Sequence, residues 1–196
     1  MMSAMNTPTL FTVARMVLIP VFILVYIIPG AWSYPASAIL FAIAALTDWF
    51  DGYLARRLNQ TTRFGAFLDP VADKLIVVAA LVLLIGAHGN LLLSLAGLVI
   101  IGREIVVSAL REWMAEMNRR GIIAVSWLGK VKTTVQIIAT IVLLAFPPDL
   151  SRPMVWIGYV LIYAAAGLTL WSMILYLRAA WPALRSGLRP DTGSSG

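Results

Sequence analysis

Four aspartates stand at close, regular intervals near the ends of two neighbouring apolar segments. Asp48 and Asp51 are three residues apart, and Asp69 and Asp73 are four residues apart. On a helix, either spacing puts the two carboxylates of a pair on the same face. Four carboxylates gathered in a low-dielectric setting repel one another, and two divalent cations would neutralise them. Because every ligand is an oxygen atom, the pattern predicts Mg²⁺ or Mn²⁺ rather than zinc.

Small residues and an arginine accompany the first aspartate pair. Gly52 and Ala55 fall on the face that carries the carboxylates, and Arg56 follows directly. Side chains this small leave room for a ligand to approach the backbone closely. The planar guanidinium of Arg56 is suited to binding phosphate. Two metal ions, a close approach and an arginine together predict phosphoryl transfer at a diphosphate.

The composition indicates that membrane helices position these residues. Of the 196 residues, 61% are hydrophobic and 12% are charged, whereas soluble domains carry about 25% charged residues. The absence of cysteine excludes disulfides, thiolate nucleophiles and cysteine-ligated metals. The net charge of +6 comes from basic residues that cluster beside apolar runs. This placement favours membrane orientation and contact with anionic lipid headgroups over nucleic-acid binding.

Six apolar segments are long enough to cross a bilayer, which takes about 20 residues of helix. The breaks between them carry turn residues, such as Pro29-Gly30 and Pro147-Pro148. We therefore predict an all-α membrane protein with one domain over residues 1–188. We expect the polar tail, residues 189–196, to be disordered or partly foreign to the natural protein. The predicted transmembrane helices cover residues 8–28, 35–57, 66–87, 90–116, 125–146 and 153–180.

Basic residues also predict how the helices are oriented. Lys and Arg concentrate in segments 57–65 and 111–132 and recur from residue 178 onward, whereas segments 29–34 and 88–90 contain none. Because short cytoplasmic loops carry the excess of Lys and Arg, we expect both termini and the active-site cavity on the cytoplasmic side. Six is an even number of transmembrane helices, so the chain would begin and end on the same side of the membrane.

Burying a charged residue inside a bilayer costs free energy, so each such residue is a candidate for a functional role. Structural ion pairs between the aspartates and nearby arginines are an alternative, but four aspartates with small residues on one face disfavour it. A divalent-cation transporter is a second alternative. A transport path needs polar residues that reach both faces of the membrane. The acidic residues here stop in the predicted cytoplasmic half, which favours an enzyme.

Residues 48–73 read DWFDGYLARRLNQTTRFGAFLDPVAD, which gives the pattern D-x2-D-G-x2-A-R-x8-G-x3-D-x3-D. At every fixed position the chain resembles the CDP-alcohol phosphotransferase family. Four further segments resemble the bacterial branch whose acceptor is glycerol 3-phosphate: NTPTLFTVARMVLIPVF, REIVVSALREWMAE, VSWLGKVKTTVQ and LTLWSM. Other members of the family use serine, inositol phosphate or phosphatidylglycerol, and these acceptors remain alternatives.

The resemblance implies an activity, an assembly and a set of site residues. The implied reaction transfers the phosphatidyl group of CDP-diacylglycerol to sn-glycerol 3-phosphate and releases CMP. The implied protein is a multi-pass homodimer of the bacterial inner membrane, with its cavity open to the lipid bilayer. Two divalent cations would be held by Asp48, Asp51, Asp69 and Asp73, the last of which would also be the catalytic base. The cytidine diphosphate group would be surrounded by Gly52, Ala55, Arg56 and Gly65.

The phosphate of such an acceptor requires a cationic pocket. Arg103 and Arg111 are eight residues apart and therefore share one face of a helix. Lys130 and Lys132 enter the next helix from the same side. We expect these four residues to bind the acceptor phosphate, with Arg111 and Lys132 as the first candidates. Lys130 is alternatively an orientation signal near the headgroups, and Arg103 alternatively pairs with Glu104 as a structural contact.

Overall fold

A computed structural model of the chain describes residues 7–58, 63–116 and 127–187, and these ranges consist of α-helices joined by short turns. The prediction of an all-α fold is therefore confirmed for the described residues. Each predicted apolar segment contains one helix, and the largest difference is at the end of the sixth, which continues beyond residue 180. The six helices are α1 (Thr7–Ile27), α2 (Ser33–Leu58), α3 (Arg63–His88), α4 (Leu91–Glu116), α5 (Trp127–Ala145) and α6 (Pro153–Gly187).

Three helices within the described residues are long and apolar enough to cross a membrane. They are Pro70–His88, Leu91–Met114 and Pro153–Pro182, whereas Val13–Ile27 and Ser33–Thr47 are apolar but shorter. Large apolar side chains also cover the outside of the bundle, which soluble monomers rarely allow over a wide area. These features are compatible with a membrane protein, while the number of spans and their direction remain predictions.

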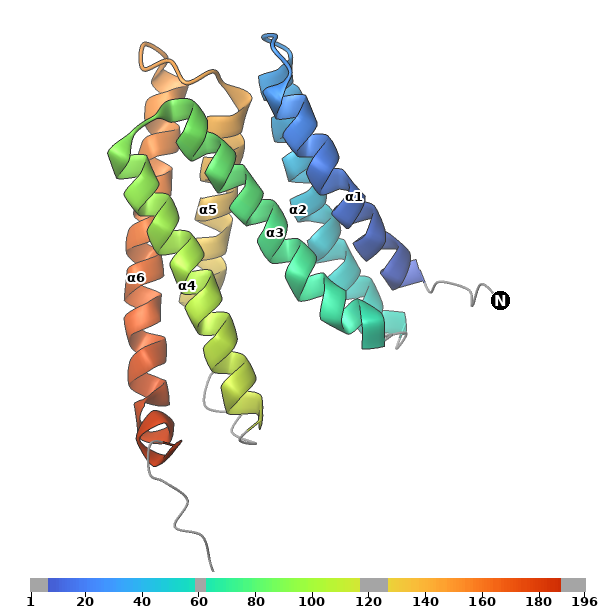
Figure 1. Cartoon of the computed structure of the whole chain (residues 1–196), viewed down its shortest axis with the longest axis vertical. Helices are drawn as coiled ribbons and strands as arrows, with labels where there is room; N and C mark the ends of the chain where they lie inside the picture. Colours follow the sequence, from blue (N-terminus) through green and yellow to red (C-terminus); the bar gives the residue numbers. More distant parts are fainter. Residues whose placement is uncertain (1–6, 59–62, 117–126, 188–196) are drawn as a thin grey trace, which may run out of the picture.

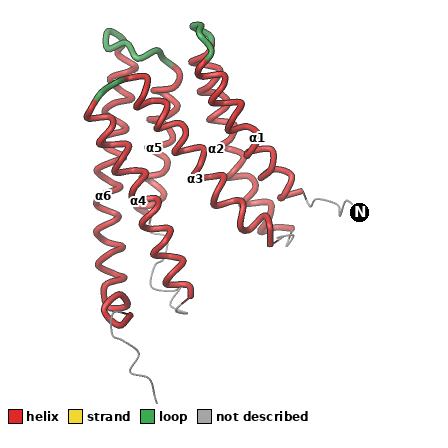
Figure 2. Tube along the Cα trace, viewed as in Figure 1, coloured by secondary structure: helices red, strands yellow, loops and turns green. Residues whose placement is uncertain are grey.

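The helices form a bundle with two groups, α1 with α2 and α4 with α5 and α6. Helix α1 packs along α2, α5 packs along α6, and contacts of α2 with α5 connect the two groups. Helix α3 crosses obliquely between them (Figure 1). The start of α1 and the end of α6 lie at the same end of the bundle, and the described turns lie at the opposite end (Figure 2). The side of the membrane on which the termini lie remains a prediction.

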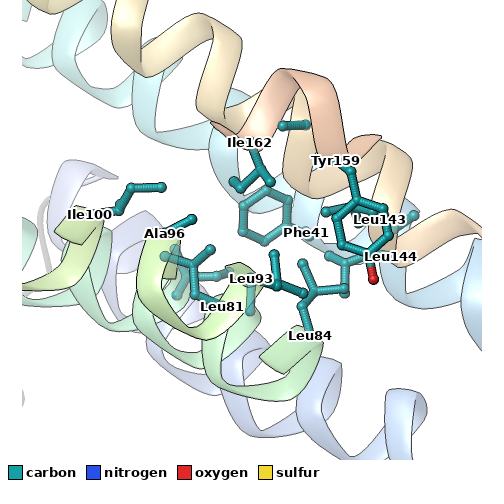
Figure 3. Close-up of a cluster of buried hydrophobic side chains, with 14 of the residues drawn as sticks. Phe41, Leu81, Leu84, Leu93, Ala96, Ile100, Leu143, Leu144, Tyr159 and Ile162 are labelled. Atoms are coloured by element: carbon teal, nitrogen blue, oxygen red, sulfur yellow. The ribbon is translucent and has the colours of Figure 1, made fainter. Parts of the chain in front are cut away.

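The apolar core lies toward the end of the bundle that holds the described turns. Phe22, Phe41, Leu84 and Leu143 are fully buried there, and α3, α4, α5 and α6 all contribute side chains (Figure 3). Helices α5 and α6 approach closely because Gly158 has no side chain. A Cβ atom at this position would lie 2.6 Å from a methyl carbon of Leu143. The core therefore fixes one end of the helices and leaves the other end available for polar groups.

The α3–α4 turn shows how local sequence ends one helix and begins the next. Gly89 has a φ of +56°, a left-handed conformation that glycine adopts without steric cost at the end of a helix. Asn90 then accepts a hydrogen bond from the backbone N–H of Leu92 at 2.9 Å, which caps the start of α4. This turn sets the angle between α3 and α4, which diverge toward the opposite end of the bundle (Figure 1).

Candidate active site

A cavity of about 250 Å³, lined by both charged and apolar side chains, lies among five helices. Its charged wall comes from α3 and α4, which provide Asp73, Lys74, Arg103, Glu104 and Arg111. The lining also includes residues of α2, α5 and α6. The cavity thus lies between the diverging halves of α3 and α4 and borders the apolar core, because Phe41 and Ile76 line it as well. Charged groups from two helices converge on a space large enough for a small substrate.

Asp73 is the only member of the aspartate quartet whose side chain the structure describes. It is exposed and lines the cavity. Residues 48–58 and 63–73 are helical, so the spacings of both aspartate pairs fall on helices as expected. Helices α2 and α3 also contact each other. The side chains of Asp48, Asp51 and Asp69 lie outside the described part of the structure.

The predicted ligands of the cytidine diphosphate group also lie on these two helices. Gly52, Ala55 and Arg56 belong to α2, and Gly65 belongs to the first turn of α3. Nothing about their side chains is described, so their roles remain predictions. Among the side chains that the structure does describe, no three carboxylates, histidines or cysteines gather as metal ligands. Of the four aspartates, only Asp73 is among these described side chains.

An ion-pair network joins α4 to α5 beside the cavity. Glu104 Oε1 accepts hydrogen bonds from Lys132 Nζ at 2.6 Å and from Arg103 Nη1 at 2.8 Å. Lys132 is 1% exposed and Arg103 is 8% exposed. A buried charge without a partner costs several kcal/mol, so the carboxylate of Glu104 stabilises both cations. The structural pairing of Arg103 with Glu104 is therefore observed, and Arg103 still lines the cavity.

A second contact joins α4 to α6 through an aromatic ring. Arg111 Nη2 donates a hydrogen bond to the Tyr176 hydroxyl at 3.0 Å. The guanidinium carbons of Arg103 and Arg111 lie 5.6 and 5.4 Å from the centre of the same ring. Such cation–π contacts are favourable, most of all where the cation is desolvated. Tyr176 thus holds two positive charges on one side of the cavity, and no motif in the sequence pointed to it.

Of the four residues predicted to bind the acceptor phosphate, two line the cavity and two do not. Arg103 and Arg111 line the cavity together, in agreement with their shared helix face. Lys132 lies behind Glu104 and is not part of the lining. Lys130 is exposed and is also absent from the lining. Lys74 donates a hydrogen bond to Ser108 Oγ on α4, so this cation too is tied to a neighbouring helix.

The described helices and the cavity define an α-helical protein, compatible with a membrane protein, that has a charged site between its helices. Residues 5–171 match the model of the CDP-alcohol phosphatidyltransferase family, and the chain belongs to this family. Its similarity to named relatives extends over most of both chains.

A relative from Pseudomonas fluorescens is 58% identical over 189 residues, which cover 95% of this chain and 96% of the relative. A relative from Shigella flexneri serotype 5b is 54% identical over 89% of this chain and 94% of its own length. A relative from Escherichia coli K12 is 53% identical with the same coverage. All three carry the name CDP-diacylglycerol–glycerol-3-phosphate 3-phosphatidyltransferase.

Proposed function

We propose that this protein transfers the phosphatidyl group of CDP-diacylglycerol to sn-glycerol 3-phosphate, forming phosphatidylglycerophosphate and CMP. Family membership and the names of the relatives support this reaction. The observation that carries the proposal is the cavity, where the carboxylate of Asp73 and the guanidinium groups of Arg103 and Arg111 line one space. Such an acceptor requires two things of the site: a carboxylate that takes the proton from its hydroxyl, and cations that bind its phosphate.

The aspartate quartet is the proposed metal site. Its four members are all carboxylates on two helices that contact each other, a donor set that suits two Mg²⁺ or Mn²⁺ ions. Asp48, Asp51, Asp69 and Asp73 would hold these ions. When bound, two divalent cations neutralise charge on a diphosphate and on a phosphoryl group in transfer.

The proposed chemistry is a single displacement at phosphorus. Asp73 takes the proton from the C1 hydroxyl of glycerol 3-phosphate, and the hydroxyl oxygen attacks the phosphorus that carries the diacylglycerol. The bond from this phosphorus to the bridging oxygen of the diphosphate breaks, and CMP leaves with the electron pair. Gly52, Ala55, Arg56 and Gly65 would orient the cytidine diphosphate group so that CMP faces away from the attacking hydroxyl.

The acceptor phosphate would bind to Arg103 and Arg111. Tyr176 restrains both guanidinium groups, so little side-chain freedom remains to be lost on binding. Lys132 would add positive charge from behind Glu104, at longer range than the arginines. Lys130 would contact the acceptor phosphate outside the cavity, before the acceptor enters.

The membrane arrangement forms part of the proposal. CDP-diacylglycerol would enter from the bilayer and glycerol 3-phosphate from the cytoplasm, so the cavity must face both. Six transmembrane helices, with both termini and the basic segments 57–65 and 111–132 in the cytoplasm, would place it at the inner leaflet. We also propose that the protein is a homodimer of the bacterial inner membrane.

A comparison of four acceptors tests the proposed reaction. Purified protein in detergent is supplied with CDP-diacylglycerol, Mg²⁺ and one acceptor at a time: glycerol 3-phosphate, serine, inositol phosphate or phosphatidylglycerol. We expect CMP release, and a new phospholipid, with glycerol 3-phosphate. Release of CMP with another acceptor and none with glycerol 3-phosphate would refute the substrate while leaving the family chemistry intact.

A further inference from the structure

Helix α6 has a buried face and an exposed face. It packs on α4 and α5 and lies at the edge of the bundle (Figure 1). Its buried face includes Thr169, Ser172 and Tyr176. The exposed face carries large apolar and basic side chains at alternating spacings of three and four residues, which keeps them on one side of the helix. These residues form the outer stripe of α6: Trp171, Ile174, Arg178, Trp181 and Arg185.

The two arginines of the outer stripe lie where the apolar part of α6 ends. Arg178 lies inside the apolar stretch Pro153–Pro182, and Arg185 lies just beyond it. A charge at membrane depth costs free energy unless a counter-charge offsets it. Among the described residues, no carboxylate forms an ion pair with either arginine, and neither arginine lines the cavity. The described part of the chain therefore leaves two exposed positive charges at this level without a counter-charge.

The order of side chains along the outer stripe matches the order of groups in a phospholipid. Trp181 lies between the arginines, and tryptophan is enriched at the level of the lipid headgroups. Ile174 and Trp171 continue the stripe into the apolar stretch, and Trp171 lies about 10 Å from Arg178 along the helix axis. A second copy of this chain fits the stripe less well, because a twofold interface along α6 would bring each arginine near its own counterpart.

We propose that the outer stripe of α6 binds an anionic phospholipid, with the headgroup at Arg178 and Arg185 and an acyl chain along Ile174 and Trp171. This inference goes beyond the proposed reaction, because the stripe lies outside the cavity, and it requires only that α6 crosses the bilayer. Guanidinium groups bind phosphate oxygens through charge-assisted hydrogen bonds. Each basic residue near an anionic membrane surface strengthens binding about fivefold. A zwitterionic phospholipid gains less, since its own ammonium group lies beside its phosphate.

Quenching of tryptophan fluorescence by brominated lipids tests this contact. Bromine quenches an indole ring that it touches, so a phospholipid brominated in its acyl chain reports lipid at Trp171. The full chain and its Trp171→Phe variant are reconstituted in bilayers of phosphatidylcholine and phosphatidylglycerol, with the bromine on one lipid or on the other. The difference between the two proteins gives the signal of Trp171. At low salt we expect phosphatidylglycerol to bind there about 3–10-fold more strongly than phosphatidylcholine.

Arginine variants assign the preference to the stripe. Arg178→Gln combined with Arg185→Gln should reduce it to less than about twofold. Arg178→Lys combined with Arg185→Lys keeps both charges and should retain most of it. Arg152→Gln is the matched control, because Arg152 is an exposed arginine at the other end of α6, and it should leave the preference unchanged. Thermal unfolding of each variant in detergent establishes that it is folded.

Several results would overturn the inference. One is equal quenching by the two brominated lipids in the unmodified protein, and another is a preference that survives the loss of both arginine charges. A lack of quenching by either lipid would mean that protein, such as a second copy, covers the stripe.

Inorganic phosphate separates a lipid headgroup from free phosphate as the ligand. Phosphate and sodium chloride at equal ionic strength should weaken the preference equally, because both act only by screening. Stronger displacement by phosphate would assign the stripe to free phosphate and refute the lipid. None of these measurements requires turnover, so a lack of CMP release with glycerol 3-phosphate refutes the proposed function separately.

Discussion

Removing the negative charge of Glu104 should be the most damaging conservative change beside the cavity. Glu104→Gln keeps the size of the side chain but leaves Lys132 and Arg103 without a counter-charge. Lys132 is 1% exposed and Arg103 is 8% exposed, so water replaces the lost partner poorly. Removing one member of a buried ion pair costs about 3–5 kcal/mol. Glu104 itself is 29% exposed, and glutamine retains a carbonyl oxygen, so we expect about 2–3 kcal/mol.

A double-mutant cycle isolates this effect. The free energy of unfolding is measured by denaturant titration in mild detergent for Glu104→Gln, Lys132→Met and the double variant. Lys132→Met should cost less than Glu104→Gln, because Glu104 keeps Arg103 as a partner and is partly solvated. The double variant should be more stable than Glu104→Gln alone, with a coupling energy of about 1–3 kcal/mol.

The control for this cycle is Glu112→Gln, an exposed glutamate on the same helix. We expect it to change the free energy of unfolding by less than about 0.5 kcal/mol. If Glu104→Gln were equally mild, the Glu104 carboxylate would not be the group that stabilises the two cations. Additive effects of the two single substitutions would lead to the same conclusion.

Three further predictions concern the chemistry and the packing. Asp73→Asn should lower kcat about 10²–10⁴-fold in the CMP-release assay while the variant remains folded, and retained turnover would remove the proposed base. Chelation by EDTA should abolish CMP release, and added Mg²⁺ or Mn²⁺ should restore it; turnover that resists EDTA would contradict the metal site. Gly158→Ala should lower the unfolding free energy by about 1–3 kcal/mol, because the new methyl group would overlap Leu143. Gly167→Ala is the matched control, since nothing lies within 4 Å of a Cβ atom there, and it should be neutral or slightly stabilising.

The helices could be predicted from the sequence because their signals are local. Long apolar runs separated by glycine, proline and asparagine indicate both the helices and the turns, and Gly89 and Asn90 form such a turn between α3 and α4. The apolar span predicted over residues 153–180 agrees with the apolar stretch Pro153–Pro182, and α6 itself continues to Gly187 with Pro182 inside the helix. A helix extends beyond its apolar segment when the residues that follow are compatible with helical backbone geometry.

The contacts between side chains of the candidate site could be predicted from the sequence only in part. The spacing of Arg103 and Arg111 correctly placed them on one face. Lys130 and Lys132 both stand near the start of α5, and residues two apart on an α-helix point about 200° apart, so the two lysines lie on different faces of this helix. The structure accordingly exposes Lys130 and buries Lys132. The contact of Arg111 with Tyr176, 65 residues away, depends on how α4 and α6 pack, which no local pattern contains.

The charges around the cavity bear on the choice of acceptor. Among the described lining residues, Lys74, Arg103 and Arg111 bring positive charge to one cavity. Guanidinium groups bind phosphate oxygens through charge-assisted hydrogen bonds, and a phosphate monoester with two negative charges gains more from them than a diester does. Serine has no net charge and phosphatidylglycerol carries a diester, so the cationic lining favours glycerol 3-phosphate or inositol phosphate. Between these two, the cavity of about 250 Å³ favours the smaller acceptor, glycerol 3-phosphate.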